Sequence, residues 1–290
     1  MKGCFRTAAL LAGIVTVWGA LALAGPAGPT LRELKQAVAA DPKNPQARYL
    51  LGLKYEIEGQ PRQALKEYQE ALRLKPDYPE VLLRTGEVKF LQGDVAGGIQ
   101  AAQQALKLNP RSSEARESLA YMYGQQGLRQ LEENRPEEAA ASLRQALEYN
   151  PRDDSILNNL GVALSQQGRL SEAREAFQEA ALSNPNNPQA QFNLGVLYLL
   201  EGNKEGALQQ YAILGLTRPQ EAAELFYLIS FPDRSGMDPS YRKFKSAIPG
   251  TAPERFRTTP TPDYPSPLQT APGLETTGRY PSSLPDSNLR

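Results

Sequence analysis

Apolar residues recur every three or four positions along most of the chain, and this spacing predicts amphipathic helices. The range Gln46–Glu58 shows the pattern clearly, with Leu50, Leu51, Tyr55 and Ile57 placed around one helix. The residues between these apolar positions are mainly charged or amide-bearing. The pattern therefore predicts helices that bury one side against a neighbour, and strands are not expected.

Glycine and proline mark where these helices end and begin. Gly59 is expected to end the first helix in a left-handed conformation, and Pro61 suits the first turn of a second helix. That second helix runs to about Lys75, because Pro76 lacks an amide hydrogen and clashes with the preceding turn. The basic unit is therefore a pair of helices.

This helix pair repeats along the chain. The prolines after each second helix are 34 residues apart, with a single step of 41: Pro42, Pro76, Pro110, Pro151, Pro185 and Pro219. Small residues repeat with the same irregularity: Gly52, Gly86, Ala120, Gly161 and Gly195; Ala64, Gly98, Ala139, Ala173 and Ala207; Ala71, Ala105, Ala146 and Ala180. Small side chains allow paired helices to approach closely, so we interpret these positions as the packing sites within each repeat.

The repeated prolines and small residues divide the chain into five repeat units and two caps. The units are 45–78, 79–112, 113–153, 154–187 and 188–221. A lone helix is expected within 30–42 before them, and a second cap within 221–248 after them. Caps are expected because each repeat buries its apolar face only against its neighbours.

The third unit carries seven extra residues between Ala120 and Ala139. Alignment of the turn at Asn134 with Gly59 places all seven in the first helix. One extra turn on each helix would instead bring the chain back level with the neighbouring repeats. A third alternative is that a glycine in this stretch ends the helix early. The insertion is either a tolerated surface protrusion or a contact for a partner.

The unit resembles the tetratricopeptide repeat family. The matching residues are Leu51-Gly52, Tyr55, Ala64, Tyr68, Ala71 and Pro76, which recur as Leu160-Gly161, Leu164, Ala173, Phe177, Ala180 and Pro185, and as Leu194-Gly195, Tyr198, Ala207, Tyr211 and Pro219. The resemblance covers about residues 30–220. It implies an all-α, right-handed superhelical solenoid of antiparallel helix pairs. Gly98, Ala102 and Leu214 depart from the family pattern and predict looser or shifted packing.

The concave groove of such a solenoid is lined by the first helix of each unit, and a protein or extended peptide is the expected partner. Equivalent places hold the candidate groove residues Tyr49, Leu53, Arg84, Glu87, Tyr121, Asn158, Asn159, Phe192 and Asn193. Asn159 and Asn193 lie one repeat apart, and their amides either pair with a peptide backbone or bond between helices. The apolar residues at the groove ends either bind an apolar partner or pack under a neighbouring element. Tyr49 and Leu53 do not suit a clamp for a C-terminal carboxylate.

Composition argues against catalysis. The formal net charge is zero, no His is present and the only Cys is Cys4. These counts exclude a His or Cys metal site, thiol catalysis and a Ser-His pair, and they do not suit a nucleic-acid binder. No phosphate-binding glycine loop occurs. We therefore expect no catalytic residue, metal or cofactor.

The first 24 residues have the pattern of an export signal. Lys2 and Arg6 precede an uncharged stretch that ends in a small-residue cleavage pattern at Ala24–Gly25. Cleavage would leave a periplasmic or secreted bacterial protein. The alternative is a retained inner-membrane anchor, with the rest of the chain facing the periplasm and acting as an assembly or secretion factor.

Residues 249–290 form a tail of different composition. Nine of these 42 residues are Pro, and Thr and Ser are abundant. Such a segment buries too little apolar area to offset the entropy of ordering, so a disordered, partly polyproline tail is predicted. A further hypothesis is that the tail lies in the groove of its own chain and competes with a partner.

Overall fold

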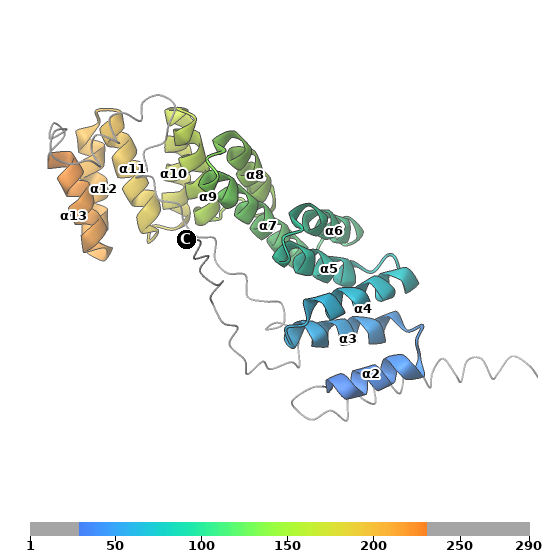
Figure 1. Ribbon diagram of the computed structural model, residues 1–290. Coiled ribbons are helices and arrows are strands. Elements are labelled where there is room, and N and C mark those ends of the chain that lie inside the picture. Colours follow the sequence, from blue (N-terminus) through green and yellow to red (C-terminus); the bar gives the residue numbers. More distant parts are fainter. Residues whose placement is uncertain (1–28, 231–290) are drawn as a thin grey trace, which may run out of the picture. The chain divides into compact units, whose positions relative to one another are not determined.

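The computed structural model describes residues 29–230, which form helices and no strands. The predicted signal segment with its cleavage site at Ala24–Gly25, the part of the second cap beyond Ser230 and the tail lie outside the described residues. The helices are α2 (Leu31–Ala40), α3 (Pro45–Ile57), α4 (Pro61–Leu74), α5 (Pro79–Leu91), α6 (Val95–Leu108), α7 (Ser113–Glu132), α8 (Pro136–Tyr149), α9 (Asp154–Gln166), α10 (Leu170–Ser183), α11 (Pro188–Leu200), α12 (Lys204–Thr217) and α13 (Pro219–Ser230) (Figure 1). The all-α fold class is confirmed.

The described residues fall into two compact units, divided between Val81 and Leu82. In the first unit, α3 and α4 form a helix pair and α2 packs against α3, as expected for a lone helix at the start of the array. Tyr68 is fully buried there and lies over Gly52, so closely that a side chain at Gly52 would clash with its ring.

The second unit stacks helix pairs in chain order. The pairs are α7–α8, α9–α10 and α11–α12, and each later first helix also packs against the second helix of the pair before it. The last helix, α13, contacts both α11 and α12. One cluster of buried apolar residues extends through this unit from Ala120 to Ile229. The core is therefore a continuous seam between stacked hairpins, the arrangement of a repeat solenoid.

The helix boundaries follow the turn chemistry of the sequence. Gly59 and Gly168 adopt positive φ angles of 69° and 74° after the first helices α3 and α9. Asn134, with φ 56°, takes the same role after α7. Asparagine tolerates this left-handed conformation better than most residues with a side chain. The predicted turns between first and second helices are therefore present at these three places.

The seven extra residues of the third repeat lie entirely in the first helix of that repeat. Helix α7 has 20 residues, compared with 13 in α3 and α9, whereas α8 has the same 14 residues as α4 and α10. The expectation of one extra turn on each helix is wrong, and no glycine ends α7 early. The extension is held by its partner helix, because Gly127 lies against Leu143 and Gln130 accepts a hydrogen bond of 2.7 Å from Ser142.

Two of the repeats pack differently from the others. In the second repeat, a Cβ atom at Gly86 would lie 2.7 Å from the backbone oxygen of Gly98, so α5 and α6 approach backbone to backbone. Of the expected looser or shifted packing, the looser form is absent there, because the missing side chains allow closer approach. In the fifth repeat, Leu225 of α13 lies against Gly195, and the ring of Tyr211 lies 5.2 Å from that of Phe226. The packing is shifted there, as the departure at Leu214 predicted.

Candidate functional site

The two candidate groove residues of the first unit pack within that unit. Tyr49 lies 6.1 Å from the ring of Tyr68 and 5.6 Å from that of Tyr78, measured between ring centroids. Leu53 is buried. Both residues therefore take the packing role that the sequence had left as an alternative to binding an apolar partner.

Arg84 is the centre of a charged cluster that joins α5 to α7. Its guanidinium nitrogens lie 3.2 Å from Glu87 Oε2 and 3.3 Å from Glu114 Oε1, and the Ser118 hydroxyl donates to the other oxygen of Glu87. Arg84 is buried, and a buried charge is costly unless it is paired. The two carboxylates supply that pairing. The ring of Tyr121 on α7 adds an edge contact with that of Phe90 on α5, with centroids 6.0 Å apart. The cluster holds successive first helices together.

The asparagine side chains form a second link, between α9 and α11. Asn193 Nδ2 donates to Asn158 Oδ1 over 2.9 Å, and Asn158 Nδ2 lies 3.5 Å from Asn159 Oδ1. All three side chains are fully buried. The structure thus shows the bond between helices that the sequence had left open, and it is Asn158 rather than Asn159 that pairs with Asn193. Contact with a peptide stays a prediction.

The inner side of α9 and α11 has a distinct chemistry. Val162 follows Gly161, which faces Phe177 of α10, so Val162 lies about 100° around α9 from the contact with α10. The residues near this direction on α9, with their counterparts on α11, are called here the inner stripe: Ser155, Asn158, Val162, Gln166, Gln189, Phe192 and Val196. None of them carries a charge. The stripe combines amide and hydroxyl groups with apolar side chains.

Gln166 is one of five members of the inner stripe that were not among the candidate groove residues of the sequence, together with Ser155, Val162, Gln189 and Val196. Its Oε1 is buried, and among the described residues it accepts no hydrogen bond. Buried polar atoms in proteins are nearly always paired, because an unpaired one has lost its water without replacement. The sequence spacing could have predicted Gln166 as a groove residue. Asn158, Val162 and Gln166 are four residues apart, and residues at that spacing lie on one side of a helix.

Most of the inner stripe is buried, and only Gln166 and Gln189 among its members are partly exposed. Eleven successive residues of α9, Ser155–Ser165, are buried, and so are eight successive residues of α11, from Ala190 to Leu197. Eleven residues make about three turns, so every side of α9 is covered. By contrast, α4 buries only Ala64, Tyr68 and Ala71 along one side.

A network of short polar side chains fixes the start of α9. Asp153 Oδ1 accepts hydrogen bonds from the backbone amides of Ser155 and Ile156, over 3.1 Å and 3.0 Å. Burial raises the pKa of the Asp153 carboxyl, the Ile156 hydrogen bond opposes the rise, and the neighbouring Asp154 adds to it. Asp154 Oδ2 accepts from Asn187, the residue that caps α11, over 2.6 Å. The two first helices of the inner stripe are therefore held in register at their N-termini.

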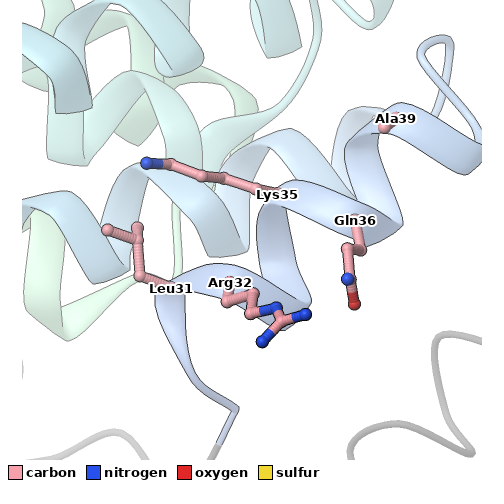
Figure 2. A pocket seen from close by; sticks show the side chains of 5 residues that line it. All are labelled: Leu31, Arg32, Lys35, Gln36 and Ala39. Carbon is pink, nitrogen blue, oxygen red and sulfur yellow. The ribbon is translucent and has the colours of Figure 1, made fainter.

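A pocket of about 560 Å³ lies against α2 in the first unit (Figure 2). It is lined by Leu31, Arg32, Lys35, Gln36 and Ala39, all from that one helix. It contains none of the candidate groove residues. Within 29–230, no cluster of three potential acidic or sulfur metal ligands occurs, and none of the helices described has the length and apolar character needed to cross a membrane.

Comparison with known proteins shows the family. The sequence profile of the tetratricopeptide repeat matches residues 31–79, 55–113, 125–188 and 164–217, which together cover more than half of the chain. The chain belongs to the tetratricopeptide repeat family. Its fold is accordingly that of a protein-interaction scaffold, and members of the family are generally non-catalytic. No curated protein matches the chain.

Several solved structures share features with this tetratricopeptide repeat protein. YrrB, described as a protein of this family with an unusual peptide-binding site, is 19% identical, with a TM-score of 0.49, and the match covers 69% of this chain and all of that one. PilF of Pseudomonas aeruginosa is 21% identical, with a TM-score of 0.46 and coverage of 77% and 96%. MamA is 22% identical, with a TM-score of 0.43 and coverage of 53% and 81%.

Proposed function

We propose that this protein is an exported, non-catalytic scaffold that binds a protein or extended peptide along the inner stripe. The observation that carries the proposal is the chemistry of that stripe on α9 and α11. It joins amide groups to apolar side chains without any charge, and the buried Oε1 of Gln166 lacks a donor among the described residues. An extended peptide supplies such donors from its backbone.

The binding mode follows from these side chains. An amide offers both a donor and an acceptor, so Gln166 and Gln189 can pair with backbone groups whatever the partner's sequence. Val162 and Phe192 would then contact the partner's apolar side chains and supply selectivity. Burying an unpaired charge is costly, so a segment rich in charged residues is disfavoured.

Export is proposed on the pattern of residues 1–24 alone, with basic residues before an uncharged stretch and small residues before Gly25. The alternative is an assembly or secretion factor that keeps this segment as an inner-membrane anchor. The intact mass of the protein from producing cells distinguishes them. Loss of 24 residues supports an exported, soluble scaffold, whereas the full mass supports the anchored form.

A photo-crosslinker tests the binding surface directly. A benzophenone side chain is placed at Gln166, in the inner stripe, and in a matched protein at Leu182, which is 80% exposed on α10. The protein is crosslinked in the cells that produce it. A discrete adduct with another protein is expected from position 166 and not from 182.

Equal crosslinking from both positions would indicate nonspecific contact, and the absence of any adduct from 166 would overturn the proposed function. Circular dichroism of each variant provides the control for folding. Adducts within the chain are scored separately, because they do not report on a partner protein.

A further inference from the structure

We propose that the protein forms a weak, reversible dimer with a second copy of the chain through the exposed side of α12. The proposal goes beyond the proposed function, because this side of α12 shares no residue with the inner stripe. Helices α12 and α13 are the last two helices described, and they pack against each other (Figure 1). Leu208, Ala212 and Leu216 are spaced by four residues along α12, and all three are exposed. These three residues are called here the apolar line.

The apolar line is specific to α12. The second helices α4, α6, α8, α10 and α12 each have 14 residues, so their positions can be compared directly. The equivalent three places hold at least one charged residue in each of the other four helices: Arg73 in α4, Lys107 in α6, Arg144 and Glu148 in α8, and Arg174 in α10. Contact with water alone gives no reason for α12 to lack such a charge, so we expect this side to meet another apolar surface.

The exposed apolar area has the size of a weak interface. Leu208 is 39% exposed, Leu216 87% and Phe226 of α13 47%. Phe226 borders the apolar line, because its ring lies against Tyr211, and Tyr211 and Leu208 are neighbours three positions apart on a helix. At about 200 Å² for a large side chain, these three residues alone expose about 350 Å². Stable dimers bury about 800 Å² per partner and transient ones less than about 600 Å², so a dissociation constant on the order of 10–100 µM is expected.

The spacing of the apolar line favours a second copy in the antiparallel direction. Ala212 lies midway between Leu208 and Leu216, so a two-fold axis at Ala212 places Leu208 of one copy opposite Leu216 of the other. The small residues Ala212 and Gly215 allow the two helices to approach closely at that point. No atom lies within 4 Å of a Cβ atom added at Gly215, so the space beside it is open.

The charges at the two ends of α12 complement each other in this arrangement. Glu205 lies three residues before Leu208, Arg218 lies two residues after Leu216, and both are exposed. Antiparallel pairing about Ala212 therefore brings Glu205 of each copy beside Arg218 of the other. Residues 206–217 between them carry no charge, so no charged group is buried at the axis. A parallel pair would instead place like charges side by side.

Sedimentation equilibrium of the full-length protein tests for self-association. Between about 2 and 200 µM, the apparent mass is expected to rise from that of one chain toward that of two. Leu216→Glu should weaken the dimer at least tenfold, because it places a charge in the apolar line. Leu182→Glu is the matched control, since Leu182 holds the equivalent place on α10 and is 80% exposed, and it should leave the association unchanged.

Circular dichroism of both variants provides the control for folding, and both substitutions lie at exposed positions. Unfolding measurements at about 1 µM lie well below the expected dissociation constant, so variants of α12 then report on the single chain.

Engineered cysteines test the antiparallel register. Cys4, the only cysteine of the sequence, is replaced by Ser in each protein. Ala212→Cys should form a disulfide-linked dimer, because its two copies meet at the two-fold axis. Leu208→Cys and Leu216→Cys should each crosslink several-fold less alone than in an equimolar mixture, since Leu208 faces Leu216 of the other copy.

The mass of a single chain up to 200 µM would overturn the proposal, and so would a dimer that Leu216→Glu and Leu182→Glu weaken equally. Crosslinking of the mixture no faster than that of each protein alone would overturn the antiparallel arrangement.

Reaction of Leu216→Cys with a water-soluble maleimide identifies any other occupant of the apolar line. Protection of position 216 in a purified single chain would show that the same chain covers the line. Protection only inside the producing cells would show that a different protein does. Both results would overturn the second copy as occupant. The crosslinker at Gln166 reports on the inner stripe separately, so failure of this inference and failure of the proposed function are distinguishable.

Discussion

Single glycines determine how closely each helix pair packs. A Cβ atom at Gly161 would lie 2.5 Å from the ring of Phe177, and one at Gly52 would lie 2.4 Å from the ring of Tyr68. In the third repeat the equivalent glycine is Gly127, which lies against Leu143, rather than Ala120 as the ladder of small residues had predicted. Because the aromatic or leucine side chain fills the space that a Cβ atom would need, the small residue and the large one form a single packing unit.

Replacement of Gly161 by Ala is therefore expected to destabilise the protein by about 1–3 kcal/mol through overpacking. Gly215 provides the matched control, because it lies in the helix α12 with nothing within 4 Å of an added Cβ atom. Gly215→Ala should stabilise by about 0.5–1 kcal/mol, since alanine is the better helix former. Urea unfolding followed by circular dichroism measures both. Equal midpoints for the two variants would contradict the packing argument.

At the scale of helices, the sequence predicted the elements well because their ends depend on local chemistry. Left-handed glycines and proline at the first turn act within a few residues, so the turn at Gly59 and the start of α4 at Pro61 could be predicted without tertiary information. The seven-residue insertion could not be placed in this way. Both helices of the third repeat could have absorbed it, and the decision depended on the packing of Gly127 and Gln130 against α8.

The N-cap of α9 leads to a prediction on pH. Burial raises the folded-state pKa of Asp153 above its ordinary value of 3.8. The folded state therefore binds the proton more tightly than the unfolded state, so this contribution is fully present below about pH 3.8 and is lost as the pH rises through the folded pKa. Asp153→Asn keeps the cap and removes the charge. The wild type should thus gain stability relative to Asp153→Asn between pH 7 and pH 4.

Thermal unfolding of the two proteins at matched pH values measures this difference. Other carboxylates titrate in both proteins alike, so their effect cancels in the comparison. A difference in melting temperature that stays constant from pH 7 to pH 4 would show that Asp153 has an ordinary pKa in the folded protein.

At the scale of the molecule, stability in the second unit depends on neighbours rather than on distant contacts. The buried cluster passes from α7 to α13, and α13 completes it with Leu225, Leu228 and Ile229. In a repeat array each unit buries its apolar side against the next one, so the last helix acts as the cap. The proposed binding surface depends on the same stacking, because the inner stripe is formed by residues of successive first helices.

Leu225→Ala should therefore cost about 2–5 kcal/mol, because Leu225 is fully buried beside Gly195. Leu216→Ala is the matched control, since Leu216 is 87% exposed on α12 and should change the stability by less than about 0.5 kcal/mol. Guanidinium unfolding of both variants measures the effect. A small loss at Leu225 would show that α13 does not serve as a structural cap.

The sequence by itself determined the repeat, the helix pairs, the family and most of the small-residue packing sites. These follow from periodicity and from turn residues whose effects are local. Only the tertiary structure decided that Asn158 bonds to Asn193, that Arg84 is held by Glu87 and Glu114, and that most of the inner stripe is buried. The Asn158–Asn193 and Arg84–Glu114 contacts join residues 35 and 30 positions apart, and burial depends on which side of a helix is covered. The hydrophobic pattern shows that a polar residue lies on a helix, whereas its partner depends on how neighbouring helices pack.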